Sequence, residues 1–388
     1  MKTIIKLLSI LSITAMLLAC ATSGSTAAVN ALDFLELGIK HAMQGDYEKA
    51  IMNFTEAVKS DPNLAEAYLL RGRAYYASVA NITNIGDRFS STIAVSRPNL
   101  TEEDMHILDL AIDDYNHVIK LSPDNAAAYL ERGSSHSYKY NNNGIMADLD
   151  QALADYNQAI KLNSNNATAY TYRAYAFHRK NDLERTIADY TQAIMVDPDN
   201  ARPLVNRGNI YFEMKDWDRA IADYDQAIRM EPDNAVYYSN RGNAYYLMKD
   251  LDKALADFIR AATLDTNNFR TYLNCGNVYY DKKDWDMAIT EYTQAIRLNP
   301  NNAISYSLRA DAYLFKEDWD RAIADYSQAV GLDPNNAYNI NRLGNAYYRK
   351  GDYGRAATSY EEALRLEPDN MVYKNNLENS RQAMRRLN

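Results

Sequence analysis

The sequence contains few of the residues that usually carry catalysis or interrupt helices. Two cysteines exclude a disulfide framework and a four-thiolate zinc site, and the five histidines are dispersed. Glycine and proline occur only 14 and 9 times, which excludes collagen-like and disordered chains. Acidic residues outnumber basic ones, and the net charge of −9 argues against nucleic-acid binding. No phosphate loop, nucleophile elbow or HExxH motif occurs, so we expect no enzyme activity, cofactor or metal site.

The first twenty residues, MKTIIKLLSILSITAMLLAC, have the pattern of a secretory signal. Lys2 and Lys6 precede an uncharged stretch that is shorter than the roughly 20 residues a spanning helix needs. Its end, LLAC, resembles the lipobox of bacterial lipoproteins, and this resemblance implies cleavage before Cys20 and lipid attachment to that cysteine. Ala21 then implies sorting to an outer membrane, facing the periplasm, if the cell has one. An ordinary signal peptide cut elsewhere and an uncleaved anchor remain alternatives.

A motif of 34 residues fills the rest of the chain. Prolines recur at this spacing, and the segment 201–234 places Gly208, Tyr211, Ala220 and Tyr224 at fixed positions that other segments share. The pattern resembles the tetratricopeptide repeat (TPR). The resemblance implies an all-α solenoid: a right-handed superhelix of about nine helix-turn-helix repeats plus a C-terminal capping helix. The expected parts are a signal peptide 1–20, a flexible tether 21–30, repeats 31–64, 65–125, 126–166, 167–200, 201–234, 235–268, 269–302, 303–336 and 337–370, and a cap 371–388.

Positions within each repeat are numbered here from 1 to 34, with Ala201 as position 1 of the fifth repeat. Tyrosine is unusually abundant, at 32 residues, and most tyrosines occupy positions 4, 11 and 24. We expect these rings to pack between helices, with their hydroxyls at a polar rim. The abundance of tyrosine therefore indicates a core and not a ligand cage.

Two repeats are longer than 34 residues. The second contains an insertion at about 79–105, and Thr101-Glu102-Glu103-Asp104 near its end predicts an early start for the next helix. The insertion could fold over the array, dock a partner or simply pack locally. The third repeat has seven extra residues, which predict one extra turn on each helix around a turn at 141–144.

Position 7 is usually leucine in the family, but here it is often arginine, always together with aspartate at position 23. Because both residues vary together, we expect ion pairs between the two helices of a repeat. In the ninth repeat the two positions are Leu343 and Ser359, and in the seventh they are Cys275 and Glu291. The predicted pairs are Arg71–Asp114, Arg132–Asp155, Arg173–Asp189, Arg207–Asp223, Arg241–Asp257 and Arg309–Asp325.

In the family, positions 2, 5, 6, 9, 12 and 13 of the first helix face a concave groove. Asparagine recurs here at positions 6 and 9, and its amide can pair with the main chain of an extended peptide. This resembles the asparagine ladder of glycosyltransferase-linked repeats. It matches the carboxylate clamp of chaperone co-factors only in part, because Val205 and Asn274 replace the needed cations. The predicted groove residues are Asn206, Asn209, Phe212, Asn240, Asn243, Tyr246, Arg270, Asn274, Asn277, Tyr280, Arg342, Asn345 and Tyr348.

We expect substitution of the position-9 asparagines by alanine to abolish peptide capture without changing the melting temperature. The sequence as a whole predicts a lipid-anchored scaffold that binds a partner protein or peptide in the bacterial cell envelope. Two other functions remain open: an accessory lipoprotein of a solute importer, and a structural spacer without a dedicated ligand.

Overall fold

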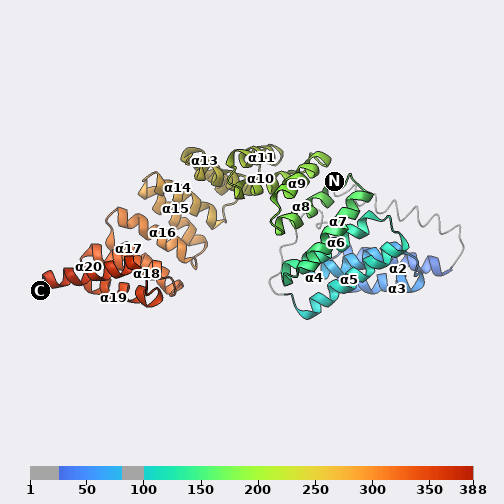
Figure 1. Ribbon diagram of the computed structural model, residues 1–388, viewed down its shortest axis with the longest axis horizontal. Coiled ribbons are helices and arrows are strands. Elements are labelled where there is room, and N and C mark those ends of the chain that lie inside the picture. The colour runs from blue at the N-terminus through green and yellow to red at the C-terminus, as the bar shows by residue number, and fades with distance from the viewer. Residues whose placement is uncertain (1–25, 81–99, 388) are drawn as a thin grey trace. The chain divides into compact units, whose positions relative to one another are not determined.

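Every element in the described part of the chain is an α-helix, which confirms the predicted all-α repeat fold. The computed structural model describes residues 26–80 and 100–387. Successive helices pair through short turns (Figure 1). The helices are α2 Thr26–Met43, α3 Tyr47–Ser60, α4 Ala65–Ala80, α5 Glu102–Leu121, α6 Ala126–Asn143, α7 Met146–Leu162, α8 Ala167–Arg179, α9 Leu183–Val196, α10 Ala201–Glu213, α11 Trp217–Met230, α12 Ala235–Leu247, α13 Leu251–Leu264, α14 Phe269–Asp281, α15 Trp285–Leu298, α16 Ala303–Phe315, α17 Trp319–Leu332, α18 Ala337–Lys350, α19 Tyr353–Leu366 and α20 Met371–Leu387.

The chain divides into two compact units, residues 1–203 and residues 204–388. Within each unit a helix packs chiefly on the helices before and after it in sequence. Even-numbered helices up to α18 are the first helix of a repeat, and odd-numbered helices are the second. None of the helices in the described ranges has the length and apolar character that crossing a membrane requires. Cys20 and the rest of the predicted signal lie outside the described residues.

Polar side chains cap both helices of a repeat. Asp216 at position 16 accepts a hydrogen bond from the backbone N–H of Arg219 and starts α11, and six other repeats use aspartate in the same way. Asn234 at position 34 caps α12 similarly. These side chains satisfy backbone donors that helix starts leave unpaired. Aspartate and asparagine therefore mark the starts of the helices in most repeats.

The turn between paired helices needs a left-handed residue at position 15. Glycine fills this position in the first and ninth repeats, at Gly45 and Gly351. Five other repeats have a larger residue there with φ between 58° and 65°, Lys283 among them. A residue with a Cβ atom pays about 1–2 kcal/mol for this conformation. The sequence pattern had not indicated this strain.

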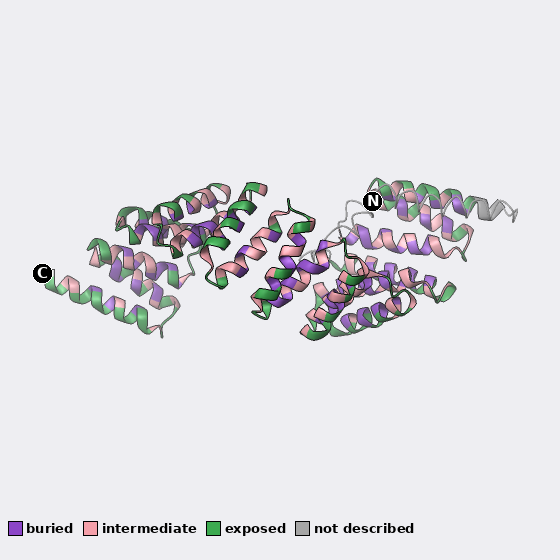
Figure 2. Ribbon diagram, turned by 90° about the horizontal axis from the view of Figure 1, so that it is seen from above, coloured by how far each residue is buried: buried purple, intermediate pink, exposed green. Residues whose placement is uncertain are grey.

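The core lies between the two helices of each pair, and every helix has a buried and an exposed side (Figure 2). The tyrosines at position 24 are at most 3% exposed, as expected for core residues. Small residues at position 8 make room for these rings: a Cβ atom on Gly208 would lie 2.8 Å from Cε1 of Tyr224. Most tyrosines at positions 4 and 11 are only half-buried, because they cover the edge of the helix pair.

The longer repeats show what their additional residues do. Thr101 and Asp104 form a reciprocal capping box at the start of α5, which confirms the predicted early helix start. Residues 81–99 of the insertion lie outside the described residues. In the third repeat α6 and α7 have 18 and 17 residues, and Gly144 ends α6 in the left-handed conformation. The extra helical turns are therefore confirmed.

The last helix, α20, packs on α19 as the first helix of a tenth repeat would. Glu378 occupies position 8, where seven of the nine repeats have glycine. This exposed carboxylate stands where a following helix would need close approach. The exposed side of α20 is therefore charged, as expected for the predicted capping helix.

Candidate functional site

One face of the first helices in unit 2 collects the predicted groove residues. Positions 2, 6, 9 and 12 are three or four residues apart, so they share one side of a helix. On α10, α12, α14 and α18 the residues at positions 6, 9 and 12 are all half-buried, and Arg270 at position 2 is exposed. The face is therefore partly open to a partner, and it is called the groove face below.

The asparagines on the groove face also bond to one another across neighbouring repeats. The Nδ2 atom of Asn240 donates to Oδ1 of Asn209 at 3.2 Å, and Asn274 donates to Asn243 at 3.4 Å. Asn376 of α20 donates in the same way to Asn345. Each bond joins position 6 of one repeat to position 9 of the repeat before it.

Buried tyrosines at position 24 also bond to asparagines at position 9. The hydroxyl of Tyr224 donates to Oδ1 of Asn209 at 2.8 Å, and Tyr292 donates to Asn277 at 2.9 Å. The amide oxygens at position 9 are thus used within the protein, and these bonds do not use the N–H groups of the same amides. The expectation that alanine at these positions leaves the melting temperature unchanged is corrected, because the substitutions remove bonds within and between repeats.

The eighth repeat replaces this amide pair with charges. Asp311 at position 9 forms an ion pair with Arg342 at position 6 of the next repeat. The Tyr326 hydroxyl donates to Asp311 and accepts from Nε of Arg342 at 3.1 Å. The guanidinium has five N–H donors, so it retains some for a ligand. Arg342 is therefore held in place at the groove face.

A cavity of about 600 Å³ opens at this end of unit 2. Three predicted residues line it: Arg342, Asn345 and Tyr348. Asn376 and Asn379 of α20 add amides on the same side. Phe315, Trp319 and Tyr360 also line it, so polar groups and aromatic surface meet in one depression, as in many binding sites.

The aromatic part of this lining, called the aromatic wall below, includes Phe315 and Trp319, which the sequence pattern had not singled out. Phe315 is 57% exposed and stacks on Trp285, with ring centroids 4.6 Å apart. Tyr280 meets both rings edge-on, which fixes their orientation. Their location at positions 13 and 17 made them detectable, since these positions adjoin the predicted tyrosines at position 12.

A second missed feature is a row of exposed apolar residues at position 2. Val236, Ile304, Tyr338 and Val372 are 55–61% exposed, and Arg270 occupies the same position in the seventh repeat. Exposed apolar residues thus occupy position 2 in the sixth, eighth and ninth repeats and in α20. The groove face therefore carries exposed apolar residues in addition to its amide groups.

The structure brings together all six predicted Arg–Asp pairs. In each pair Nε and Nη2 of arginine donate to the two carboxylate oxygens at 2.6–2.9 Å. The aspartate side chains are only 2–9% exposed and the arginine side chains 17–20%. This bidentate geometry is the strong form of the interaction.

In five of these pairs the arginine also reaches the repeat before its own. The Nη1 atom of Arg241 donates to Asp225 at 2.5 Å, and that of Arg309 donates to Thr293 at 3.0 Å. The acceptor is always position 25, sixteen residues earlier in the sequence. The arginines therefore link successive repeats as well as the two helices of one repeat.

The seventh repeat lacks this arrangement. Cys275 is 1% exposed, and burial together with the charge of Glu291 raises its thiol pKa to about 12. Such a thiol is protonated and unreactive at neutral pH. Burial also raises the pKa of the Glu291 carboxyl, and no ion pair forms with it in the described part of the chain.

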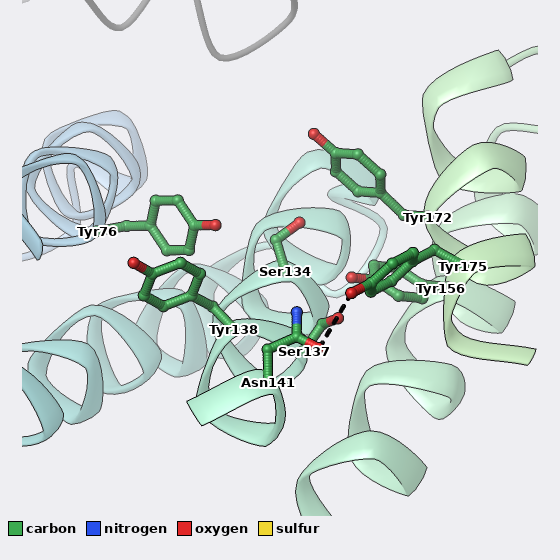
Figure 3. A pocket seen from close by; sticks show the side chains of 8 residues that line it. All are labelled: Tyr76, Ser134, Ser137, Tyr138, Asn141, Tyr156, Tyr172 and Tyr175. Carbon is green, nitrogen blue, oxygen red and sulfur yellow. Dashed lines mark hydrogen bonds between the residues drawn. The ribbon is translucent and has the colours of Figure 1, made fainter. Parts of the chain in front are cut away.

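Unit 1 presents different residues at the same positions. Arg73 at position 9 donates to Glu131 at position 6 of the next repeat, at 3.0 Å. The third and fourth repeats instead form a small hollow lined by tyrosines and serines (Figure 3). Within residues 26–80 and 100–387 no three His, Cys, Asp or Glu side chains gather as a metal site would require.

Helix pairs stacked in a 34-residue frame define a helical-repeat solenoid, a fold used as a scaffold for protein–protein interaction. A TPR repeat model matches residues 41–78, 148–181, 174–215, 208–249, 242–283, 276–315 and 310–351, and a tetratricopeptide repeat model matches residues 337–370. The chain belongs to the tetratricopeptide repeat family.

Solved structures with the same fold include a tetratricopeptide repeat protein from Parabacteroides merdae. It is 22% identical with a TM-score of 0.47, and the match covers 65% of this chain and 98% of that one. Yeast Tom70 is 17% identical with a TM-score of 0.45, covering 92% and 89%. Pseudomonas aeruginosa pilF is 23% identical with a TM-score of 0.45, covering 54% and 92%. No curated protein matches the chain.

Proposed function

We propose that this protein is a lipid-anchored scaffold of the bacterial cell envelope that holds an extended segment of a partner protein on the groove face of unit 2. The lipobox-like end of the N-terminal segment, LLAC, supports the anchor. One observation carries the binding function: the 600 Å³ cavity in which Arg342, Asn345 and Tyr348 meet an exposed aromatic wall.

The groove face suits a peptide main chain with neutral or apolar side chains. Its amide N–H groups can donate to peptide carbonyl oxygens without regard to sequence. In an extended peptide successive side chains point to opposite sides, so they can contact the position-2 residues and the aromatic wall in turn. Main-chain bonds would supply affinity, and the flanking apolar surfaces would supply selectivity.

The test compares two sets of substitutions that match in number and charge. The groove set is Val236→Lys, Ile304→Lys and Val372→Lys, at residues that are 57–61% exposed and outside the amide bonds. The control set is Met52→Lys, Met195→Lys and Ile259→Lys, at residues 48–69% exposed on second helices. Exposed substitutions of this kind change stability by less than about 0.5 kcal/mol each.

Native membranes would be extracted with mild detergent, and proteins that co-purify with each version would be identified. We expect one partner to be captured by the wild type and by the control set, and to be lost with the groove set. Equal capture by all three versions would refute binding at this face. Recovery of an importer component would instead favour the transport alternative, and no specific capture would favour the spacer.

A further inference from the structure

The hollow in unit 1 has a composition that the rest of the groove-side surface does not repeat. Its floor is one side of α6, where Ser134, Ser137 and Asn141 are spaced three and four residues apart. In Figure 3, Tyr76 and Tyr138 stand on one side of these residues. Tyr156, Tyr172 and Tyr175 stand on the other side. The walls are ring surfaces, and the floor is small and polar.

Two changes from the usual repeat produce this shape. Ser134 and Ser137 occupy positions 9 and 12, where most unit 2 repeats have an asparagine and an aromatic residue. Tyr172 and Tyr175 occupy positions 6 and 9 of the following repeat, where asparagine is usual. Small residues between large ones leave a depression because the backbones keep their spacing.

The seven-residue insertion completes the hollow. It extends α6 to Asn143, and Asn141 lies on the added turn. The hydroxyl of Tyr175 donates to Oδ1 of Asn141 at 3.2 Å, which orients the amide and leaves its two N–H groups for another acceptor. The insertion therefore has a local consequence at the surface, beyond lengthening two helices.

The walls are rigid before anything binds. Tyr76 and Tyr138 pack edge-to-face with centroids 5.5 Å apart, and Tyr156 and Tyr172 lie 6.0 Å apart. Tyr156 is 1% exposed and Tyr138 is 2% exposed, so surrounding side chains hold both rings in place. Preformed walls reduce the entropy that a ligand must lose on binding.

Size and charge restrict the occupant. The cavity measures about 30 Å³, enough for about two water-sized groups, whereas a benzene ring needs a cavity of about 150 Å³. None of the eight lining side chains carries a charge, so an ionic group would lose its hydration without compensation. The occupant is therefore small and neutral.

The hydrogen-bonding groups on the floor of the hollow further restrict which chemical group can occupy it. Ser134 donates to the backbone oxygen of Leu130, and the hydroxyls of Ser134 and Ser137 also bond to the buried Tyr156 hydroxyl. A hydroxyl oxygen has two lone pairs, so the serines keep capacity to accept a further bond. Asn141 offers donors on the opposite side of the same floor. An apolar occupant would leave the N–H groups of Asn141 without an acceptor, whereas a hydroxyl can accept from this amide and donate to a serine oxygen.

We infer that this hollow is an anchor subsite for a threonine or serine side chain of an extended partner segment. Threonine carries a hydroxyl oxygen and a methyl carbon on Cβ, and the hollow has room for two groups of this size. The hydroxyl faces the polar floor and the methyl group faces the tyrosine rings. The inference rests on the proposed peptide-binding function and assigns unit 1 a selectivity that the groove face of unit 2 does not have.

The test uses the full chain and a library of end-capped nonapeptides with randomised positions. Peptides selected on the wild type would be resynthesised as threonine and valine versions, which have the same shape. We expect threonine to bind about tenfold more tightly than valine, the value of one net hydrogen bond.

Three variants test whether the preference for threonine over valine arises at the hollow. Ser137→Leu fills the hollow and should abolish binding of the threonine peptides. Ser137→Ala leaves the space open and should reduce the preference for threonine over valine. Ser327→Leu, at an exposed serine of α17, should change nothing. Melting of each variant would be recorded, and Ser137→Ala keeps the test valid if Ser137→Leu fails to fold.

Peptides that bind the wild type and both Ser137 variants equally would overturn the subsite and leave the proposed function standing. Equal affinity of the wild type for the threonine and valine versions of a peptide would also overturn the subsite and leave the proposed function standing. If no library peptide binds the wild type, the proposed peptide-binding function fails and the subsite fails with it.

Discussion

The Arg–Asp pairs allow the most direct test of how the repeats hold together, and Arg309 is the best position. Its guanidinium donates to both oxygens of Asp325 at 2.7 and 2.8 Å and to Thr293 of the preceding repeat at 3.0 Å. Its side chain is 17% exposed and that of Asp325 is 9% exposed. Removing the arginine leaves a buried carboxylate without its counter-charge.

The expected cost of Arg309→Leu is about 3 kcal/mol, the lower end of the range for breaking a buried pair, because some solvent still reaches Asp325. Adding Asp325→Ser recreates the Leu343 and Ser359 combination of the ninth repeat. The double variant should lose only about 1 kcal/mol, since no charge is then stranded and one bond is missing. Because Asp325→Ser alone also has a cost, the implied coupling is more than about 2 kcal/mol.

Urea unfolding followed by tryptophan fluorescence is the suitable assay. All three tryptophans, Trp217, Trp285 and Trp319, lie in unit 2, so their fluorescence follows the unit that contains the pair. Far-ultraviolet circular dichroism would follow the whole chain in parallel. If the two single losses add up to that of the double variant, the residues do not interact energetically and the reasoning is refuted.

Three further predictions concern other parts of the chain. Glu291→Gln should stabilise unit 2 at pH 7 by less than about 1 kcal/mol, because burial disfavours the charged carboxylate and raises its pKa in the folded state. The gain should shrink as the pH falls through that raised pKa and vanish below the unfolded value, which urea titrations at pH 7 and pH 4 would check; a constant gain would contradict this. Lys283→Gly should stabilise by about 0.5 kcal/mol because φ is 63°, whereas glycine at Lys282, where φ is −76°, should destabilise. Cys20→Ser should leave an unprocessed precursor that takes up no labelled palmitate, and normal processing of this variant would refute lipidation at Cys20.

The sequence was sufficient to predict those structural features that depend on residues within one repeat. The helix pairs, the caps such as Asp216 and the partners of the position-7 arginines follow from spacings of three, four or sixteen residues along a helix pair whose geometry is nearly constant. The small residue at position 8 follows for the same reason, since it always faces the ring at position 24. Repetition made these features visible in a single sequence.

The tertiary structure decided what happens between repeats. The bond from Asn240 to Asn209, the charge pair of Arg342 with Asp311 and the pair of Arg73 with Glu131 join residues 31 to 58 positions apart. Which positions meet depends on how far each repeat is shifted and rotated against its neighbour, and helix periodicity does not specify that. The same offset turns the serines of α6 and the tyrosines beside them into a hollow. Amino-acid sequence alone therefore determined the repeat, whereas packing between repeats determined which polar groups remain available to a partner.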